Sequence, residues 1–177
     1  VSHSADPSEA VQKTNDYMTA YGDTDCIYAT GEDYITPAAD VIKSRGITDC
    51  KIYGSNISPS VCQLIMDGQV EACTGGEFVC GSLAVTLLIN YLDGNPIKDA
   101  DGTAPYFDNL TQFMVTAENA EDFYEFLSDE NLATHTISDE EYQNLLVRNN
   151  PDVDYDYFYD FLTNYEENVY AKVEANA

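Results

Sequence analysis

The sequence predicts an α/β fold: a three-layer αβα lobe built on a mainly parallel sheet, followed by a C-terminal helical extension. Short strands that are apolar on both faces alternate with helical segments along residues 1–127. Such alternation is typical of a parallel sheet that helices cover on both sides. The 177 residues, of which 44% are hydrophobic, supply enough material for one ordinary hydrophobic core.

The first predicted helix has a clear start signal. Asp6 is expected to cap it, with Pro7 at the first helical position and Glu9 placed to complete a capping box. Apolar runs, cap residues and closing glycines indicate the elements that follow. They are a first helix ending near 21, a strand at 26–30, a helix at 36–45, a strand at 51–54, a helix at 58–66, a strand at 71–74 and a helix at 78–92.

Beyond Gly94 the pattern loosens, then tightens into a further predicted strand at 111–116 and a helix that begins near Ala117. The segment from Ser128 onward is acidic and rich in tyrosine, and its apolar and aromatic residues recur at helix-like intervals. We expect helices in this segment, because its aromatic content is too high for a solvated tail.

The chain is strongly acidic. Seven Lys and Arg residues stand against thirty-two Asp and Glu residues, which gives a net charge of −25. Such a field repels phosphate backbones and anionic lipid headgroups, so nucleic acid is not an expected partner. Acidic surfaces mostly keep proteins soluble, and the charge by itself names no ligand. The first residues lack the pattern of a signal peptide, so we expect any export signal to lie outside the printed sequence.

The five cysteines form an odd set, so at least one is free or pairs outside the chain. Cys26, Cys50 and Cys73 lie in or beside apolar runs, where we expect buried free thiols; one disulfide is the alternative. Their spacing fits no zinc site, and no metal or other cofactor is expected. His3 and His135 have no evident nucleophile partner, so no enzymatic activity is predicted.

Five segments occur in an order and spacing that resemble the second, carboxyl-terminal lobe of ribose-binding-like (type I) periplasmic or extracellular sugar-binding proteins of ABC transporters. They are 25–33, 52–56, 65–74, 81–97 and 115–120. The resemblance implies that residues 1–127 form a partial second lobe and that residues 128–177 form an acidic, Tyr-rich helical extension packing on it. The resemblance also implies that the first strand and helix of this lobe are missing from the sequence. The sheet is therefore expected to expose an edge, and we expect the chain to self-associate there.

The same resemblance implies a function. The chain is expected to bind a small polar solute, a carbohydrate, and to deliver it to an ABC permease from an extracytoplasmic position, either periplasmic or as a cell-surface lipoprotein. Two alternatives stay open at this point: a ligand-sensing regulatory domain like the effector domain of LacI-type repressors, and a non-transporting sensor with an altered site.

Solutes bind beyond the carboxyl ends of the strands in open parallel sheets, which locates the candidate site. Carboxylates and amides bond to hydroxyl groups, and aromatic rings stack on sugar rings. The candidate ligand-binding residues are Glu32, Asp33, Tyr34, Asn56, Glu77 and Phe78. Three positions depart from the family pattern, which has Asn-Asp at Gly31-Glu32, Asp at Asn56, and Gln with Asn or Asp near Gly75-Gly76. Each carboxylate could instead be a solvated loop cap, and each ring a packing residue.

Overall fold

The computed structural model describes residues 6–129 and 136–177, so His3 and His135 lie outside the described residues. The chain folds as two compact units. The first unit comprises the segments up to Gly75, Met114–Ser128 and Ala177, and the second comprises Gly76–Phe113 and Asp129–Asn176. The predicted boundary between residues 127 and 128 stays a prediction.

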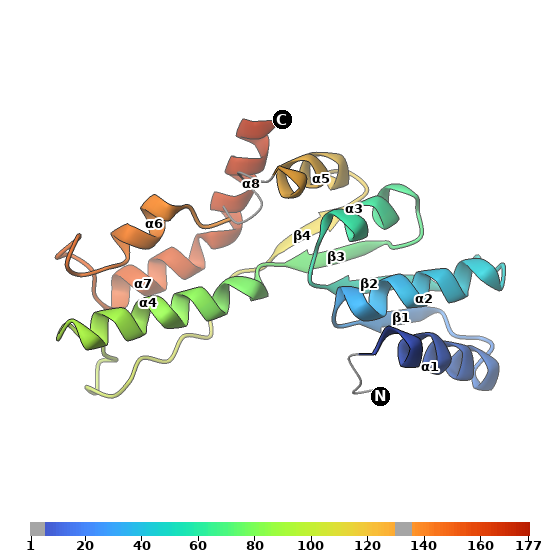
Figure 1. Cartoon of the computed structure of the whole chain (residues 1–177), viewed down its shortest axis with the longest axis horizontal. Coiled ribbons are helices and arrows are strands. Elements are labelled where there is room, and N and C mark those ends of the chain that lie inside the picture. The colour runs from blue at the N-terminus through green and yellow to red at the C-terminus, as the bar shows by residue number, and fades with distance from the viewer. Residues whose placement is uncertain (1–5, 130–135) are drawn as a thin grey trace. The chain divides into compact units, whose positions relative to one another are not determined.

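The sheet of the first unit has four strands in the order β1-β2-β3-β4 (Figure 1). The strands are β1 (Cys26–Ala29), β2 (Lys51–Ser55), β3 (Ala72–Gly75) and β4 (Phe113–Thr116). β1 runs parallel to β2, and β2 runs parallel to β3, with Gly54 opposite both Ala29 and Cys73. The predicted α/β fold with a mainly parallel sheet is therefore confirmed.

Four helices accompany this sheet (Figure 1). They are α1 (Pro7–Ala20), α2 (Glu32–Ser44), α3 (Pro59–Met66) and α5 (Ala120–Ser128). α1 packs on α2, and α3 packs on α5. The predicted cap of α1 is present, since the Asp6 carboxylate accepts a hydrogen bond from the Ser8 N–H at 2.9 Å. Buried Ile35, Ile52, Val61 and Phe123 contribute to the core.

Two predictions about this unit were wrong. α2 begins at Glu32 and not at Thr36, so Pro37 lies inside the helix and not near its start. A proline usually marks a helix start, but here the burial of Ile35 and Pro37 favours the longer helix. Cys26 is exposed, because it lies on the sheet face that also carries the exposed Tyr28 and Tyr53. Cys50 and Cys73 are buried as expected.

The second unit is mainly helical. Its described residues form a 3-10 turn (Glu77–Val79) and four helices, α4 (Cys80–Leu92), α6 (Asp139–Asn144), α7 (Tyr155–Thr163) and α8 (Tyr165–Asn176). The predicted helices of the C-terminal segment are thus present in its described part. Ser138 and Glu141 form a capping box that starts α6. No helix among the described residues is long and apolar enough to cross a bilayer.

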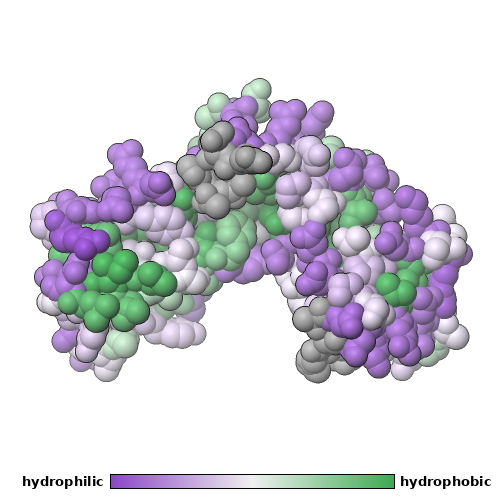
Figure 2. All heavy atoms as spheres, viewed as in Figure 1, coloured by the Kyte–Doolittle hydropathy of each residue, from purple (hydrophilic) through white to green (hydrophobic). Residues whose placement is uncertain are grey.

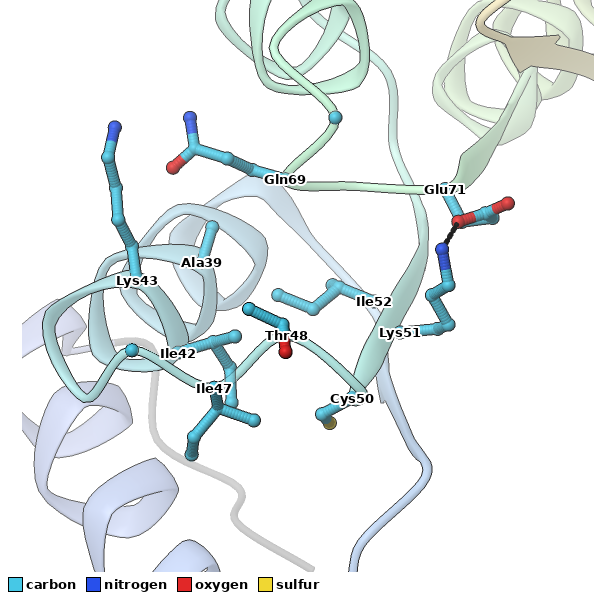
Figure 3. A pocket seen from close by; sticks show the side chains of 12 residues that line it. Ala39, Ile42, Lys43, Ile47, Thr48, Cys50, Lys51, Ile52, Gln69 and Glu71 are labelled. Carbon is cyan, nitrogen blue, oxygen red and sulfur yellow. Dashed lines mark hydrogen bonds and ion pairs between the residues drawn. The ribbon is translucent and has the colours of Figure 1, made fainter.

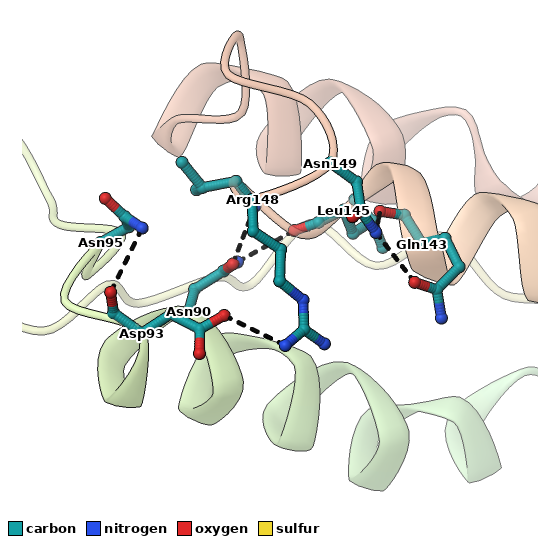
Figure 4. Close-up of polar contacts among 8 residues, drawn as sticks. Asn90, Asp93, Asn95, Gln143, Leu145, Arg148 and Asn149 are labelled. Carbon is teal, nitrogen blue, oxygen red and sulfur yellow. Dashed lines mark hydrogen bonds and ion pairs between the residues drawn. The ribbon is translucent and has the colours of Figure 1, made fainter.

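A buried asparagine holds α4 against the segment that follows α6 (Figure 4). Asn90 is fully buried, and its amide nitrogen donates to the Leu145 carbonyl at 2.9 Å. Its amide oxygen accepts from the Val147 N–H, also at 2.9 Å. Nearby, the Arg148 guanidinium lies 3.4 Å from the Asp93 carboxylate. The Asn90 side chain therefore takes the place of a backbone partner for two main-chain groups.

The opposite face of α4 is apolar and exposed. Its exposed large side chains are Val85, Leu88, Tyr91 and Leu92. They recur at helical spacing, and Figure 2 shows apolar surface in this region. α4 is thus apolar on two faces, of which only the one carrying Leu83, Thr86 and Asn90 is covered within the second unit.

Candidate functional site

The carboxyl ends of β1 and β2 lie at the same edge of the sheet, because the two strands are parallel. β1 leads through Gly31 into α2, and β2 leads into Asn56 and then α3. The loops after both strands therefore open onto one edge, as the parallel fold predicts. Of the predicted site residues, Glu32, Asp33 and Asn56 lie there.

Glu32 and Asp33 occupy the first turn of α2. The backbone N–H groups of a helix start carry partial positive charge, which stabilises carboxylates at this position. The preceding residue, Gly31, has no side chain that could cap the helix. Among the ion pairs of the described residues, none involves either carboxylate. Both groups are therefore placed to accept hydrogen bonds from a bound molecule.

A hydrogen bond from a serine joins the first turns of α2 and α3. The Ser60 hydroxyl, in the first turn of α3, donates to the Glu32 carboxylate. Ser60 also lies 3.0 Å from the hydroxyl of Ser58, which caps α3 by accepting from the Val61 N–H. Sequence reasoning missed Ser60, because nothing in the local pattern places it beside a residue of another helix. The contact fixes one oxygen of Glu32.

Asn56 adopts a left-handed backbone conformation with φ of 76° directly after β2. Asparagine tolerates this region better than most residues, which explains its presence at a tight exit from a strand. Its side chain is exposed. The left-handed backbone conformation by itself explains why an asparagine occurs here. Its position at the end of β2 is what makes Asn56 a candidate ligand-binding residue.

A cavity of about 470 Å³ lies between the starts of α1 and α2. Its polar lining includes Glu32, Asp33, Thr36 and Asp40. The Thr36 hydroxyl is buried and has no hydrogen-bond partner among the described residues. Sequence reasoning missed Thr36 and Asp40, although their spacing of three and seven residues from Asp33 puts all three on one face of a helix. The cavity is therefore acidic and offers one unused hydroxyl.

Tyr34 lines a different cavity. This groove of about 540 Å³ lies along α1 and β1 and is lined by Tyr17, Tyr21 and Tyr28 as well. Lys13 is the one charged residue that lines it. The structure thus separates Tyr34 from the cavity of Glu32 and Asp33, although the three residues are adjacent in sequence.

Glu77 and Phe78 belong to the second unit, where they form the 3-10 turn. Phe78 is 43% exposed. Both carboxylate oxygens of Glu77 are buried and lack a hydrogen-bond partner among the described residues. Contact of either residue with a solute stays a prediction.

The other end of the sheet holds a cavity of mixed charge (Figure 3). It has a volume of about 340 Å³ and lies at the start of β2, with Lys43, Lys51 and Glu71 among its lining residues. Lys51 and Glu71 form an ion pair at 2.6 Å, and this hydrogen bond raises the pKa of Lys51. Both partners are largely exposed, so the pair adds little stability. This cavity provides an internal comparison for the acidic one.

The sequence matches the model of one protein family, described as the periplasmic binding protein domain, over residues 1–96. This match covers more than half of the chain. The chain belongs to the periplasmic binding protein family. No curated protein matches the sequence.

Solved structures of periplasmic binding proteins share the fold. The arabinose-transporter component from Shewanella sp. ANA-3, bound to L-arabinofuranose, matches with a TM-score of 0.57 and 20% identity, over 72% of this chain and 42% of its own. A periplasmic sugar-binding protein from Pseudomonas fluorescens matches with a TM-score of 0.61 and 18% identity, over 86% of this chain and 45% of its own. The arabinose-binding protein AraP from Geobacillus stearothermophilus matches with a TM-score of 0.55 and 19% identity, over 68% of this chain and 42% of its own.

The chain therefore spans less than half the length of each of these periplasmic binding proteins. The resemblance read from the sequence is confirmed for the family and the fold. By description, these proteins are sugar-binding proteins, and two of them are periplasmic. That the chain corresponds to the second of two lobes, with an extension after residue 127, stays a prediction.

Proposed function

We propose that this periplasmic binding protein binds a small polar solute, a carbohydrate, for uptake through an ABC permease. The observation that carries the proposal is the grouping of Glu32, Asp33 and Asn56 at the carboxyl edge of a parallel sheet in a chain of this family. Periplasmic and sugar-binding relatives favour uptake over a regulatory role. Delivery to the permease from an extracytoplasmic position, either periplasmic or as a cell-surface lipoprotein, is part of the same proposal.

The chemistry of the edge suits a polyhydroxylated molecule. Glu32 and Asp33 accept hydrogen bonds from hydroxyl groups, and the Asn56 amide both donates and accepts. Thr36 adds a hydroxyl that is unused among the described residues. An anionic solute is disfavoured, because carboxylates line the acidic cavity and its lining includes no basic residue. Stacking of the Tyr34 and Phe78 rings on a sugar stays a prediction, because Tyr34 lines a different cavity and Phe78 belongs to the second unit.

Thermal unfolding in the presence of a panel of mono- and disaccharides, amino acids and nucleosides tests this function. A bound solute stabilises the folded chain by RT ln(1 + [L]/Kd), about 2.7 kcal/mol at about 100 times the Kd. That stabilisation raises the Tm by roughly 5–10 °C for a domain of this size. We expect one sugar to produce the shift.

Two matched variants locate the binding. Asp33→Asn removes a charged acceptor and is expected to weaken sugar binding by about tenfold or more. Glu71→Gln makes the same change at the opposite end of the sheet and is expected to leave the shift unaltered. The proposal fails if no member of the panel raises the Tm, or if Glu71→Gln reduces the shift as much as Asp33→Asn does.

We further propose that the chain self-associates through β1. β1 is an end strand of the sheet, and the Lys51 N–H donates to the Asp25 carbonyl on its inner side, so alternate backbone groups of β1 face outward. The strand contains no proline or lysine to block pairing. The adjoining groove carries the positive charge of Lys13 and no carboxylate, which removes repulsion at this one face of an acidic chain. A second copy of the chain is the partner that fits this edge, because the β1 strands of two copies can pair about a twofold axis.

Light scattering across a concentration series is expected to show dimers that dissociate on dilution. Tyr28→Lys places a charge on the outer edge, where Tyr28 is exposed, and should yield monomers at all concentrations. Tyr106→Lys, at an exposed position in the second unit, should not change the dimer. A wild-type chain that is monomeric throughout the series would contradict the pairing.

A further inference from the structure

The carboxylate of Glu77 lies buried beside the start of α4. Both of its oxygens are inaccessible to solvent, and neither has a hydrogen-bond partner among the described residues. An ionised carboxylate that is removed from water without a partner loses several kcal/mol of solvation. A stable fold does not keep such a group unless something neutralises it or bonds to it.

Two further buried groups share this condition. The hydroxyls of Tyr165 and Thr136 are buried without a hydrogen-bond partner among the described residues. Each of the two residues is 1% exposed. Tyr165 is the first residue of α8, and Thr136 lies shortly before α6. Among the described residues of the second unit, five buried side-chain oxygen atoms therefore lack a partner: these two hydroxyls, both oxygens of Glu77 and the amide oxygen of Asn109.

These groups lie close to one another. A Cβ added at Gly76 would come within 2.9 Å of the Tyr165 ring, so this ring packs against the backbone directly before Glu77. Burial raises the pKa of the Tyr165 phenol, and Thr136 and Glu77 both lie near enough to the phenol to shift this pKa, in opposite directions. Glu77 and Thr136 therefore both lie in the neighbourhood of Tyr165.

The Lys172 ammonium does not form a hydrogen bond with the Glu77 carboxylate. It donates to the Thr136 carbonyl at 2.9 Å and to the Glu141 carboxylate at 2.5 Å. Burial opposes ionisation of Glu141, but the hydrogen bonds from Lys172 and Ser138 outweigh it and lower the pKa of Glu141. Lys172 is thus paired with Glu141 and gives no hydrogen bond to Glu77.

The donor set indicates what could bind. It consists of oxygen atoms, which suit hard cations and not the soft metals that prefer sulfur or imidazole. It carries one negative charge, which one monovalent cation balances. The described residues hold no cluster of three acidic, His or Cys side chains, such as a divalent ion would favour. A water molecule could bond to these oxygens but could not balance the charge.

We propose that Glu77, Tyr165 and Thr136 form a buried site for a single monovalent cation, Na⁺ or K⁺, within the second unit. The site is independent of the proposed solute binding, and it gives Glu77 a structural role in place of the predicted contact with the solute. The packing of the Tyr165 ring on Gly76 holds the phenol over the start of the turn.

Thermal unfolding of the full chain in choline, sodium and potassium chloride at equal ionic strength tests the site. Choline is too large to enter a closed site. We expect sodium or potassium to raise the Tm by about 3–6 °C over choline, as for a cation at about ten times its Kd. Equal Tm values in the three salts would mean that water alone occupies the site and would overturn the proposal.

Three variants separate this site from general screening of the acidic chain. Glu77→Gln should abolish the preference for sodium or potassium and raise the Tm in choline, because the unbalanced charge is gone. Tyr165→Phe should reduce the preference without changing the charge. Glu167→Gln, at an exposed position of α8, should keep it. A preference that survives both Glu77→Gln and Tyr165→Phe contradicts the site, whereas an altered sugar response in Glu77→Gln would return Glu77 to the solute site.

Discussion

Replacing Asn90 with leucine is expected to lower the free energy of unfolding of the second unit by about 2–4 kcal/mol. The substitution keeps the approximate volume but removes both hydrogen bonds of the buried amide. The Leu145 carbonyl and the Val147 N–H would then be left without partners next to a leucine side chain. Chemical denaturation followed by circular dichroism measures the loss.

Asn95→Leu is the matched control for this prediction. Asn95 is exposed, and its side-chain amide makes one long hydrogen bond of 3.4 Å, to the Asp93 carbonyl (Figure 4). Its replacement should change the free energy of unfolding by less than about 0.5 kcal/mol. If Asn90→Leu is as mild as Asn95→Leu, the buried amide does not hold α4 in the way the structure indicates.

Gly54→Ala is expected to destabilise the first unit by about 2–3 kcal/mol. A Cβ at this position of β2 would lie 2.5 Å from Cδ1 and 2.8 Å from Cγ1 of Ile35, and 3.0 Å from the Ala29 carbonyl oxygen. Ile35 is fully buried, so its side chain has little room to move aside. The close approach of α2 to β2, and with it the position of Glu32, depends on this glycine.

A double-mutant cycle distinguishes this clash from a general effect of removing a glycine. Ile35→Ala makes room, so Gly54→Ala should cost less in that background than in the wild type. Gly22→Ala, at an exposed position with no close side-chain neighbour, should change stability little. Additive effects of Gly54→Ala and Ile35→Ala would show that the two residues do not compete for the same space.

Much of the fold could be predicted from local signals. The Asp6-Pro7 start and the glycines that close each helix depend on backbone chemistry that acts within a few residues, and the predicted strands lie within one or two residues of the observed ones. The start of α2 could not be predicted in this way, because the burial of Ile35 overrides the usual position of Pro37.

The candidate site was predicted in part. Parallel topology places Glu32, Asp33 and Asn56 at one edge, and this follows from the order of the elements alone. The contact of Ser60 with Glu32, and the separation of Tyr34 from the cavity of Glu32 and Asp33, depend on tertiary packing. The spacing of residues along the sequence does not reveal such packing.

Mapping the backbone amides that respond to the preferred sugar, by two-dimensional NMR of the isotope-labelled chain, tests the central claim most directly. The claim is that a solute binds at the carboxyl edge of the sheet. We predict that the largest shift changes occur at Glu32, Asp33 and Asn56, with little change at Lys43 and Lys51 on the opposite edge. Changes confined to Lys43 and Lys51, or no changes at saturating sugar, would contradict the account.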